Sequence, residues 1–218
     1  DPGYVQERSV WIIIRDFEQE SCFVLALWAF SIMGYKSTRS SQSFRLLDRD
    51  LVPVAEGTTI LPEDAREYAR QIESLPAPDR SSLLPRALLT GLHRFTATRS
   101  IQDVSGTAHG ACEAESERME SELSMVRYIA WAIPSIGFIG TVRGIGEALG
   151  QAHKAVEGDI AGVTQSLGVA FNSTLIALLI SLVLMFLLHQ LQLQQERLVM
   201  DTKNYLDRHL IQRLQVSS

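Results

Sequence analysis

The chain has 218 residues, of which 46% are hydrophobic and 21% are charged, and its net charge at pH 7 is −5. These averages would suit one soluble domain. However, a helix over the uncharged residues 163–188 would be about 39 Å long, enough to cross a hydrocarbon core of about 30 Å, which excludes a wholly soluble protein. The mild acidity and the lack of an RNA- or DNA-binding motif exclude nucleic acid as an expected partner.

The amino-terminal part predicts an interfacial helix followed by a first span. An apolar run at Val10–Ile14 precedes several charged residues that end at Glu20, a pattern typical of an amphipathic helix at a membrane surface. Residues 21–35 then carry no charge. We therefore expect residues 1–20 to be periplasmic and interfacial and residues 21–36 to form the first transmembrane helix. This helix would act as its own membrane signal, because no cleavable signal peptide is recognisable.

Residues 37–126 predict a small helical domain on the cytoplasmic side. Five prolines divide its first half into short helices over residues 62–75 and 86–101. From Ala108 the pattern turns strongly helical and continues into the second span, with no breaker until Pro134. We interpret the acidic run on this helix as a solvated face or, alternatively, as a partner surface; it contains Glu113, Glu115, Glu117, Glu120 and Glu122.

Two further spans are expected, joined by a short periplasmic loop. Residues 127–150 form the second span, residues 151–162 the loop and residues 163–189 the third span. Residues 190–218 then form a cytoplasmic amphipathic helix, which we expect to pack on the helix before the second span or on neighbouring subunits. Lys and Arg cluster beside the inner ends of the spans, so the amino terminus is expected outside and the carboxyl terminus inside.

Small side chains line one face of each of the last two spans. Such stripes let helix backbones approach closely, and their hydroxyl groups can form hydrogen bonds across the contact. We interpret the stripes as helix packing alone or, alternatively, as packing combined with a lumen that holds another helix or water and ions. The stripes contain Ala130, Pro134, Gly137, Gly140, Thr141, Gly144 and Ala148 in the second span, and Ser166, Ala170, Ser173, Thr174, Ala177 and Ser181 in the third.

Polar and charged groups in the spans are candidates for function, because they are costly in a bilayer and usually face protein or a cavity. The uncharged candidates are Thr141, Gln165, Asn172 and Thr174. Arg143 and Glu147, spaced i, i+4, can form a charged pair, either structural or in an ion path. No Asp or Glu lies in the apolar part of any span, so we expect a partner helix to supply any carboxylate that carries protons.

No enzyme active site, cofactor site or metal site is expected. The sequence has no nucleophile elbow, phosphate loop or clustered metal ligands, and its five histidines are scattered. The two cysteines, Cys22 and Cys112, lie far apart and predict free thiols.

Two segments resemble a known family. Residues 134–145, PSIGFIGTVRGI, resemble the PxxGxxGTVxGI signature of the MotA/TolQ/ExbB proton-channel family, and residues 167–179, LGVAFNSTLIALL, are similar to its last pore helix. The resemblance covers about residues 118–214. Three spans with an outside amino terminus and a large loop after the first span fit the TolQ and ExbB branch.

The resemblance implies an ion-driven motor in the bacterial inner membrane. A homopentamer of this chain would surround a dimer of a single-span TolR-, ExbD- or MotB-like partner whose membrane Asp takes up protons. Thr141 and Thr174 would line the pore, Pro134 would mark its start, and proton flow would transmit work to the envelope.

Other functions stay open at this point. ExbB-type proteins commonly have a glutamate near Val169 and an apolar or aromatic residue at Arg143, so the process driven, whether TonB-, Tol-, gliding- or defence-like, and the choice of proton or sodium are open. A non-conducting membrane scaffold is the alternative to a motor, and a conventional channel that works without a partner is a third class.

Overall fold

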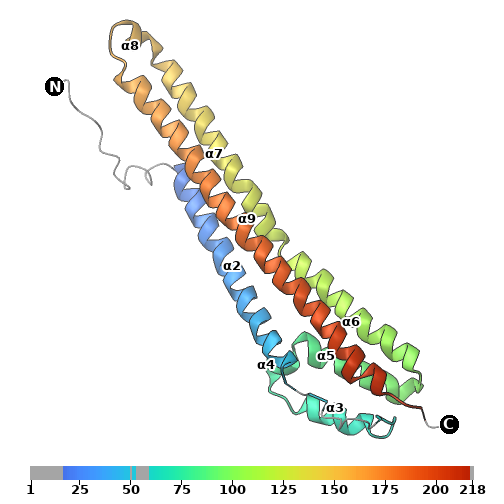
Figure 1. Cartoon of the computed structure of the whole chain (residues 1–218). Coiled ribbons are helices and arrows are strands. Elements are labelled where there is room, and N and C mark those ends of the chain that lie inside the picture. The colour runs from blue at the N-terminus through green and yellow to red at the C-terminus, as the bar shows by residue number, and fades with distance from the viewer. Residues whose placement is uncertain (1–16, 50, 53–58, 217–218) are drawn as a thin grey trace. The chain divides into compact units, whose positions relative to one another are not determined.

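The computed structural model describes residues 17–49, 51–52 and 59–216, so most of the predicted interfacial segment lies outside the described residues. The described chain is all-helical, which confirms the predicted all-α class; it contains no β-strand, and an isolated β-bridge joins Ile60 to Leu214. Figure 1 shows the helices, whose bounds are α2 (Phe17–Leu47), α3 (Ala65–Glu73), α4 (Ala77–Arg80), α5 (Leu83–Thr98), α6 (Ile101–Glu122), α7 (Ser124–Gly150), α8 (Ala152–Val156), α9 (Ala161–His209) and the 3-10 helix η1 (Ile211–Arg213).

The chain divides into two compact units. The apolar unit contains the described residues up to Gly34 together with Ser124–His189, and the polar unit contains the described residues of Tyr35–Leu123 and those from Gln190 onward. α2 and α9 each contribute one part to each unit.

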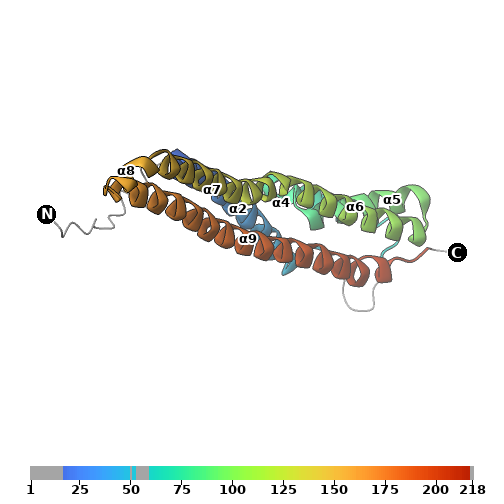
Figure 2. The same ribbon diagram turned by 90° about the horizontal axis from the view of Figure 1, so that it is seen from above.

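Two long antiparallel helices dominate the apolar unit. α7 and the first part of α9 are joined through α8 and lie side by side in Figures 1 and 2. Within the described residues, the helical segments Ile101–Gly150 and Ala161–Arg213 are long and apolar enough to cross a membrane. α2 does not meet this criterion over its described length, so the first of the three predicted spans stays a prediction. Large apolar side chains cover the exposed faces, among them Trp131, Phe138, Phe171, Leu178, Leu182 and Phe186.

The polar unit closes around a core of large apolar side chains. α5 packs closely, since a Cβ atom on Gly91 would lie 2.9 Å from Cδ2 of Leu210. Backbone hydrogen bonds from Ile60 N to Arg213 O (2.7 Å) and from Gln215 N to Ile60 O (3.1 Å) fasten the loop before α3 to the chain after η1. The core brings α6 and the last part of α9 into one cluster, and the sequence predicts that these two helices pack together. The members of the core include Leu88, Leu92, Phe95, Val104, Cys112, Val199 and Leu206.

Local chemistry shifts the ends of the short helices from their predicted positions. α5 begins at Leu83, three residues before the predicted start, because Pro85 lies in the first turn, where its missing N–H is not needed. It ends at Thr98 because Arg99 adopts a left-handed backbone with φ of 51°. Ser100 then caps α6, and its hydroxyl oxygen accepts a hydrogen bond from Asp103 N at 3.3 Å.

The helix expected to run unbroken into the second span is interrupted. α6 ends at Glu122 and α7 begins at Ser124, so Leu123 separates them, at the boundary between the two units. Pro134, which the sequence marked as the first breaker, lies inside α7.

Candidate ion-path site

α7 and α9 meet along a seam of small side chains. The seam consists of Gly137, Gly140 and Gly144 on α7 and Ala170, Ser173 and Ala177 on α9. A Cβ atom on Gly144 would lie 2.6 Å from the Cβ of Ala170, one on Gly140 would lie 2.6 Å from the Ser173 Oγ, and one on Gly137 would overlap the Cβ of Ala177. The two backbones are therefore as close as glycine permits, and the residues predicted to pack are the ones that touch.

Two threonines form hydrogen bonds across the seam. The hydroxyls of Thr141 and Thr174 contact each other. Thr141 Oγ1 also donates to Ala170 O at 3.1 Å, and Thr174 Oγ1 donates to Gly137 O at 2.8 Å. Each hydroxyl carries one proton, so the two bonds to carbonyls can form together, or a bond between the hydroxyls can replace one of them. The pair lies in the uncharged stretch of both helices and is half-buried.

Pro134 and Ser181 are linked through a backbone carbonyl. Proline has no N–H, so Pro134 leaves the carbonyl of Ala130, four residues earlier, without its helical donor. Ser181 Oγ donates to this carbonyl at 2.9 Å. The hydroxyl from α9 thus satisfies a group that would otherwise be unpaired in an apolar setting.

The structure separates the residues expected to line a pore. Ser173 and Ser181 are buried within the subunit, and Ser173 Oγ donates to Ala170 O at 2.8 Å. Thr141, Thr174 and Pro134 are half-buried, and Asn172 is exposed. A lumen between subunits needs side chains that are accessible on each subunit, so Thr141, Thr174 and Asn172 are better placed for it than the two serines.

Arg143 forms its ion pair with α2 rather than within α7. Its Nη2 donates to Oε2 of Glu18 at 2.8 Å, whereas the expected partner, Glu147, is exposed one turn away. The i, i+4 pair expected from the sequence therefore gives way to a pair between residues 125 positions apart in the chain.

Glu18 is the site residue that sequence reasoning missed. It stands among charged neighbours that suggested an interfacial helix, yet it is only 7% exposed. The available signal was helical spacing, since the small or apolar residues Cys22, Ala26, Ala29 and Met33 follow on the same face of α2 and are also buried.

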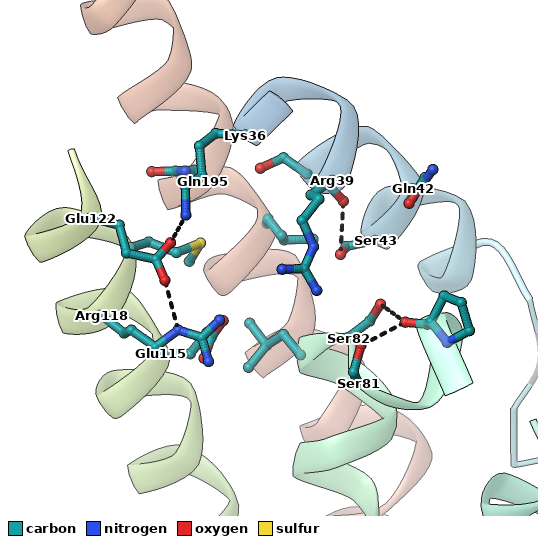
Figure 3. Close-up of a pocket in the computed structure, with 15 residues that line it drawn as sticks. Lys36, Arg39, Gln42, Ser43, Ser81, Ser82, Glu115, Arg118, Glu122 and Gln195 are labelled. Atoms are coloured by element: carbon teal, nitrogen blue, oxygen red, sulfur yellow. Dashed lines mark hydrogen bonds and ion pairs between the residues drawn. The ribbon is translucent and has the colours of Figure 1, made fainter. Parts of the chain in front are cut away.

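A separate pocket lies within the polar unit, and its lining includes Lys36, Glu115, Arg118 and Glu122 (Figure 3). Glu122 pairs with Lys36 and with Arg118, the latter at 3.2 Å, and Glu115 pairs with Arg86 at 2.6 Å. With a side chain only 12% exposed, Glu115 is not part of a solvated face. The solvated-face interpretation of the acidic run is thus wrong for Glu115 and holds for Glu117, which is exposed.

Two basic side chains of the pocket keep Glu122 ionised. Burial alone would raise the pKa of this carboxyl, but the hydrogen bonds and positive charges of Lys36 and Arg118 outweigh it and hold the pKa below its ordinary value of 4.5. Glu122 therefore stays ionised and keeps α2 and α6 tied within the polar unit. No group of three or more His, Cys, Asp or Glu side chains within the described residues could hold a metal ion.

A comparison with models of protein families gives a match. The model of the MotA/TolQ/ExbB proton channel family matches residues 80–204, more than half of the chain. The match contains α6, α7 and the seam, together with Thr141 and Thr174. A search of curated protein sequences found no match.

Proposed function

The chain belongs to the MotA/TolQ/ExbB proton channel family, and from this premise we propose that it is the channel-forming subunit of an ion-driven motor, with Thr141 and Thr174 on the ion path. The observation that carries the proposal is the hydroxyl pair on the α7–α9 seam. The pair lies in an uncharged stretch and is half-buried. Its two hydroxyls can form a hydrogen bond with each other or donate to backbone carbonyls. Groups with this freedom can exchange hydrogen bonds with a passing ion or its water.

The proposed assembly needs a partner. Five copies of this chain would surround two copies of a single-span TolR-, ExbD- or MotB-like protein, whose membrane Asp would meet the threonines. The exposed apolar faces of α7 and α9 support this, because they offer surface for lipid and for neighbouring copies. In the proposed topology the chain crosses the inner membrane three times, with its amino terminus periplasmic and its carboxyl terminus cytoplasmic, and it passes work to the cell envelope.

The experiment combines mass and ion flux. The chain would be co-expressed with a single-span partner from a neighbouring gene, weighed by native mass spectrometry, and reconstituted in vesicles that hold a pH-sensitive dye. A 5:2 complex that conducts protons is expected, and Thr141→Ala with Thr174→Ala should abolish the flux while the mass stays the same. Thr202→Ala is the matched control, because this threonine of α9 lies in the polar unit and donates to Leu198 O. Unchanged flux in the double variant would remove the threonines from the path.

A second function, a non-conducting scaffold, is favoured by one observation. The small side chains of the seam are used within the subunit, and the hydroxyls of Ser173 and Ser181 are bonded to carbonyls. A scaffold predicts a stable assembly without proton flux. A chain that conducts alone would instead indicate a conventional channel.

A further inference from the structure

The packing of the apolar unit brings a carboxylate next to the threonine pair. Glu18, in the first turn of α2, accepts a hydrogen bond from Arg143 on α7. Gly140 makes room for it, because a Cβ atom at that position would lie 3.5 Å from Cγ of Glu18 and 2.6 Å from the Ser173 Oγ. Gly140 directly precedes Thr141. A carboxylate from the amino-terminal helix therefore lies on the same seam as the proposed path.

The level of Glu18 along the helices can be read from α9. Through Gly140 it lies beside Ser173, which is ten residues from Val163 and fifteen from Leu188 in the uncharged stretch. At 1.5 Å per residue these separations are about 15 and 22 Å. Figure 1 agrees, since α2 begins partway along the pair formed by α7 and α9. Glu18 is therefore level with the middle of the apolar stretch rather than with its end.

The two members of the pair differ in burial. Glu18 is 7% exposed, whereas the Arg143 side chain is 47% exposed. If the pair separates, the guanidinium can turn outward, but the carboxylate stays buried. A buried carboxylate without a counter-charge is costly, and binding a proton removes that cost. The pair is thus built so that separation and protonation of Glu18 occur together.

Among the described residues, the surroundings of Glu18 contain little besides Arg143 that could neutralise it. On its own helix, the Cys22 thiol is one turn away and Glu20 is exposed; on α7, Arg143 is the cation; and α9 offers no charged side chain over residues 163–188. The adjacent Gln19 is 1% exposed, and its Oε1 accepts no hydrogen bond from the described residues. Two buried polar side chains in one turn are unfavourable for packing alone, because a buried polar group without a hydrogen-bond partner is costly.

We propose that Glu18 is a proton-binding carboxylate of the ion path, with Arg143 as its releasable counter-charge, an inference that rests on the proposed function. One proton adds to the carboxylate, the ion pair breaks, and Arg143 keeps its charge and moves outward. Loss of that proton restores the carboxylate and the pair. The chain therefore contributes its own titratable group, in addition to any that a partner supplies.

Infrared spectroscopy tests proton binding without any measurement of transport. The full chain, alone or with its partner, is titrated with acid, and the carbonyl band of protonated carboxyl groups is followed. Glu18→Gln should lose one band that Glu20→Gln and Glu147→Gln keep, since these two carboxylates are exposed. Arg143→Gln should show the Glu18 band already at pH 7. A titration of Glu18→Gln identical to that of the unmodified chain would overturn the proposal.

Proton flux tests the role of this group. In the vesicle assay, Glu18→Gln should lower the flux at least tenfold with the mass of the complex unchanged, and Glu18→Gln with Arg143→Gln should not recover it. A neutral double variant with full flux would show that the pair only holds helices together, which would overturn the proposal. If the unmodified complex conducts no protons, the proposed function is wrong, and the infrared titration alone decides whether Glu18 binds a proton.

Discussion

The contact between α7 and α9 in the apolar unit uses the smallest side chains of the chain, whereas the polar unit closes around large ones. Gly140 and Gly144 meet Ser173 and Ala170 on the seam, while Phe95 is fully buried in the polar core. The two units also differ in charge. Ion pairs recur in the polar unit, whereas in the apolar unit α7 and α9 meet along uncharged stretches and Arg143 pairs with Glu18 of α2.

The solvent explains the difference. In water, burying large apolar side chains is the main favourable term, so a big core stabilises the polar unit. In lipid, apolar side chains gain nothing by leaving their surroundings, so close backbone contact and hydrogen bonds to carbonyls decide which helices pair. Opposite substitutions should therefore destabilise the two units. The polar unit should lose stability when a large side chain is removed, and the apolar unit when one is added to the seam.

The largest expected effect is Phe95→Ala in the polar unit. Removing this fully buried ring should cost about 3–5 kcal/mol of unfolding free energy. Cys112 reports the effect, because burial raises the pKa of this thiol to about 11 and keeps it protonated, so it reacts with maleimide only after the unit opens. Labelling of Cys112 should become faster by at least about a hundredfold. Met200→Ala is the control, since Met200 lies on α9 in the same unit and is exposed. Equal acceleration at buried Cys22 would show that the two units open together.

Next in size is Gly144→Leu on the seam. The new side chain would meet Ala170 and Ser166 of α9, and overpacking of this kind costs about 1–3 kcal/mol. Here labelling of Cys22, in the apolar unit, should rise more than that of Cys112. Gly146→Leu, two residues along the same helix, is the matched control because nothing lies within 4 Å of a Cβ atom there. If both variants behaved alike, close contact would not hold α7 to α9.

Periodicity predicted much of the seam and little of what crosses it. The spacing of glycine, alanine and serine gave the correct faces of α7 and α9, because both helices follow a regular 3.6-residue period. It could not show that Ser181 bonds to Ala130 O, because that contact depends on the register between two helices.

The sequence alone also does not predict ion pairs between residues that are distant in the chain. Glu18 and Arg143 are 125 positions apart, and local spacing favoured Glu147 as the partner instead. The sequence predicts the helical pieces of the polar unit. It does not predict that Glu115 pairs with Arg86, because these two residues are also far apart in the chain.

A smaller effect is expected from substituting Ser181, whose hydroxyl donates to Ala130 O, alone and together with Pro134 in a double-mutant cycle. Ser181→Ala should cost about 0.6 kcal/mol, the average for a hydrogen bond between membrane helices, and at most about 1.7 kcal/mol, since it leaves Ala130 O without a donor. In a Pro134→Ala background the cost should fall toward zero, because the restored N–H of residue 134 bonds to the same carbonyl. Ser31→Ala is the control, as its hydroxyl bonds only within α2. Equal costs in both backgrounds would show that the hydrogen bond from Ser181 does not compensate for the N–H that Pro134 lacks.

The smallest effect concerns charge in the polar unit. Glu122→Gln should lower the unfolding free energy by less than about 1 kcal/mol at pH 7, because its pairs with Lys36 and Arg118 are partly exposed. The pKa of Glu122 is lower in the folded chain than its ordinary value of 4.5, so this contribution is fully present above that value and is lost as pH falls through the folded pKa. Denaturation from pH 7 to pH 3 should thus show the variant and the unmodified chain converging in acid. Glu117→Gln, which changes an exposed carboxylate five residues earlier on α6, should show no such convergence. If the unfolding free energy of Glu122→Gln were still lower than that of the unmodified chain at pH 3, packing and not charge would tie Glu122 into the polar unit. The ion pairs of the polar unit would then distinguish it from the apolar unit in composition but not in stability.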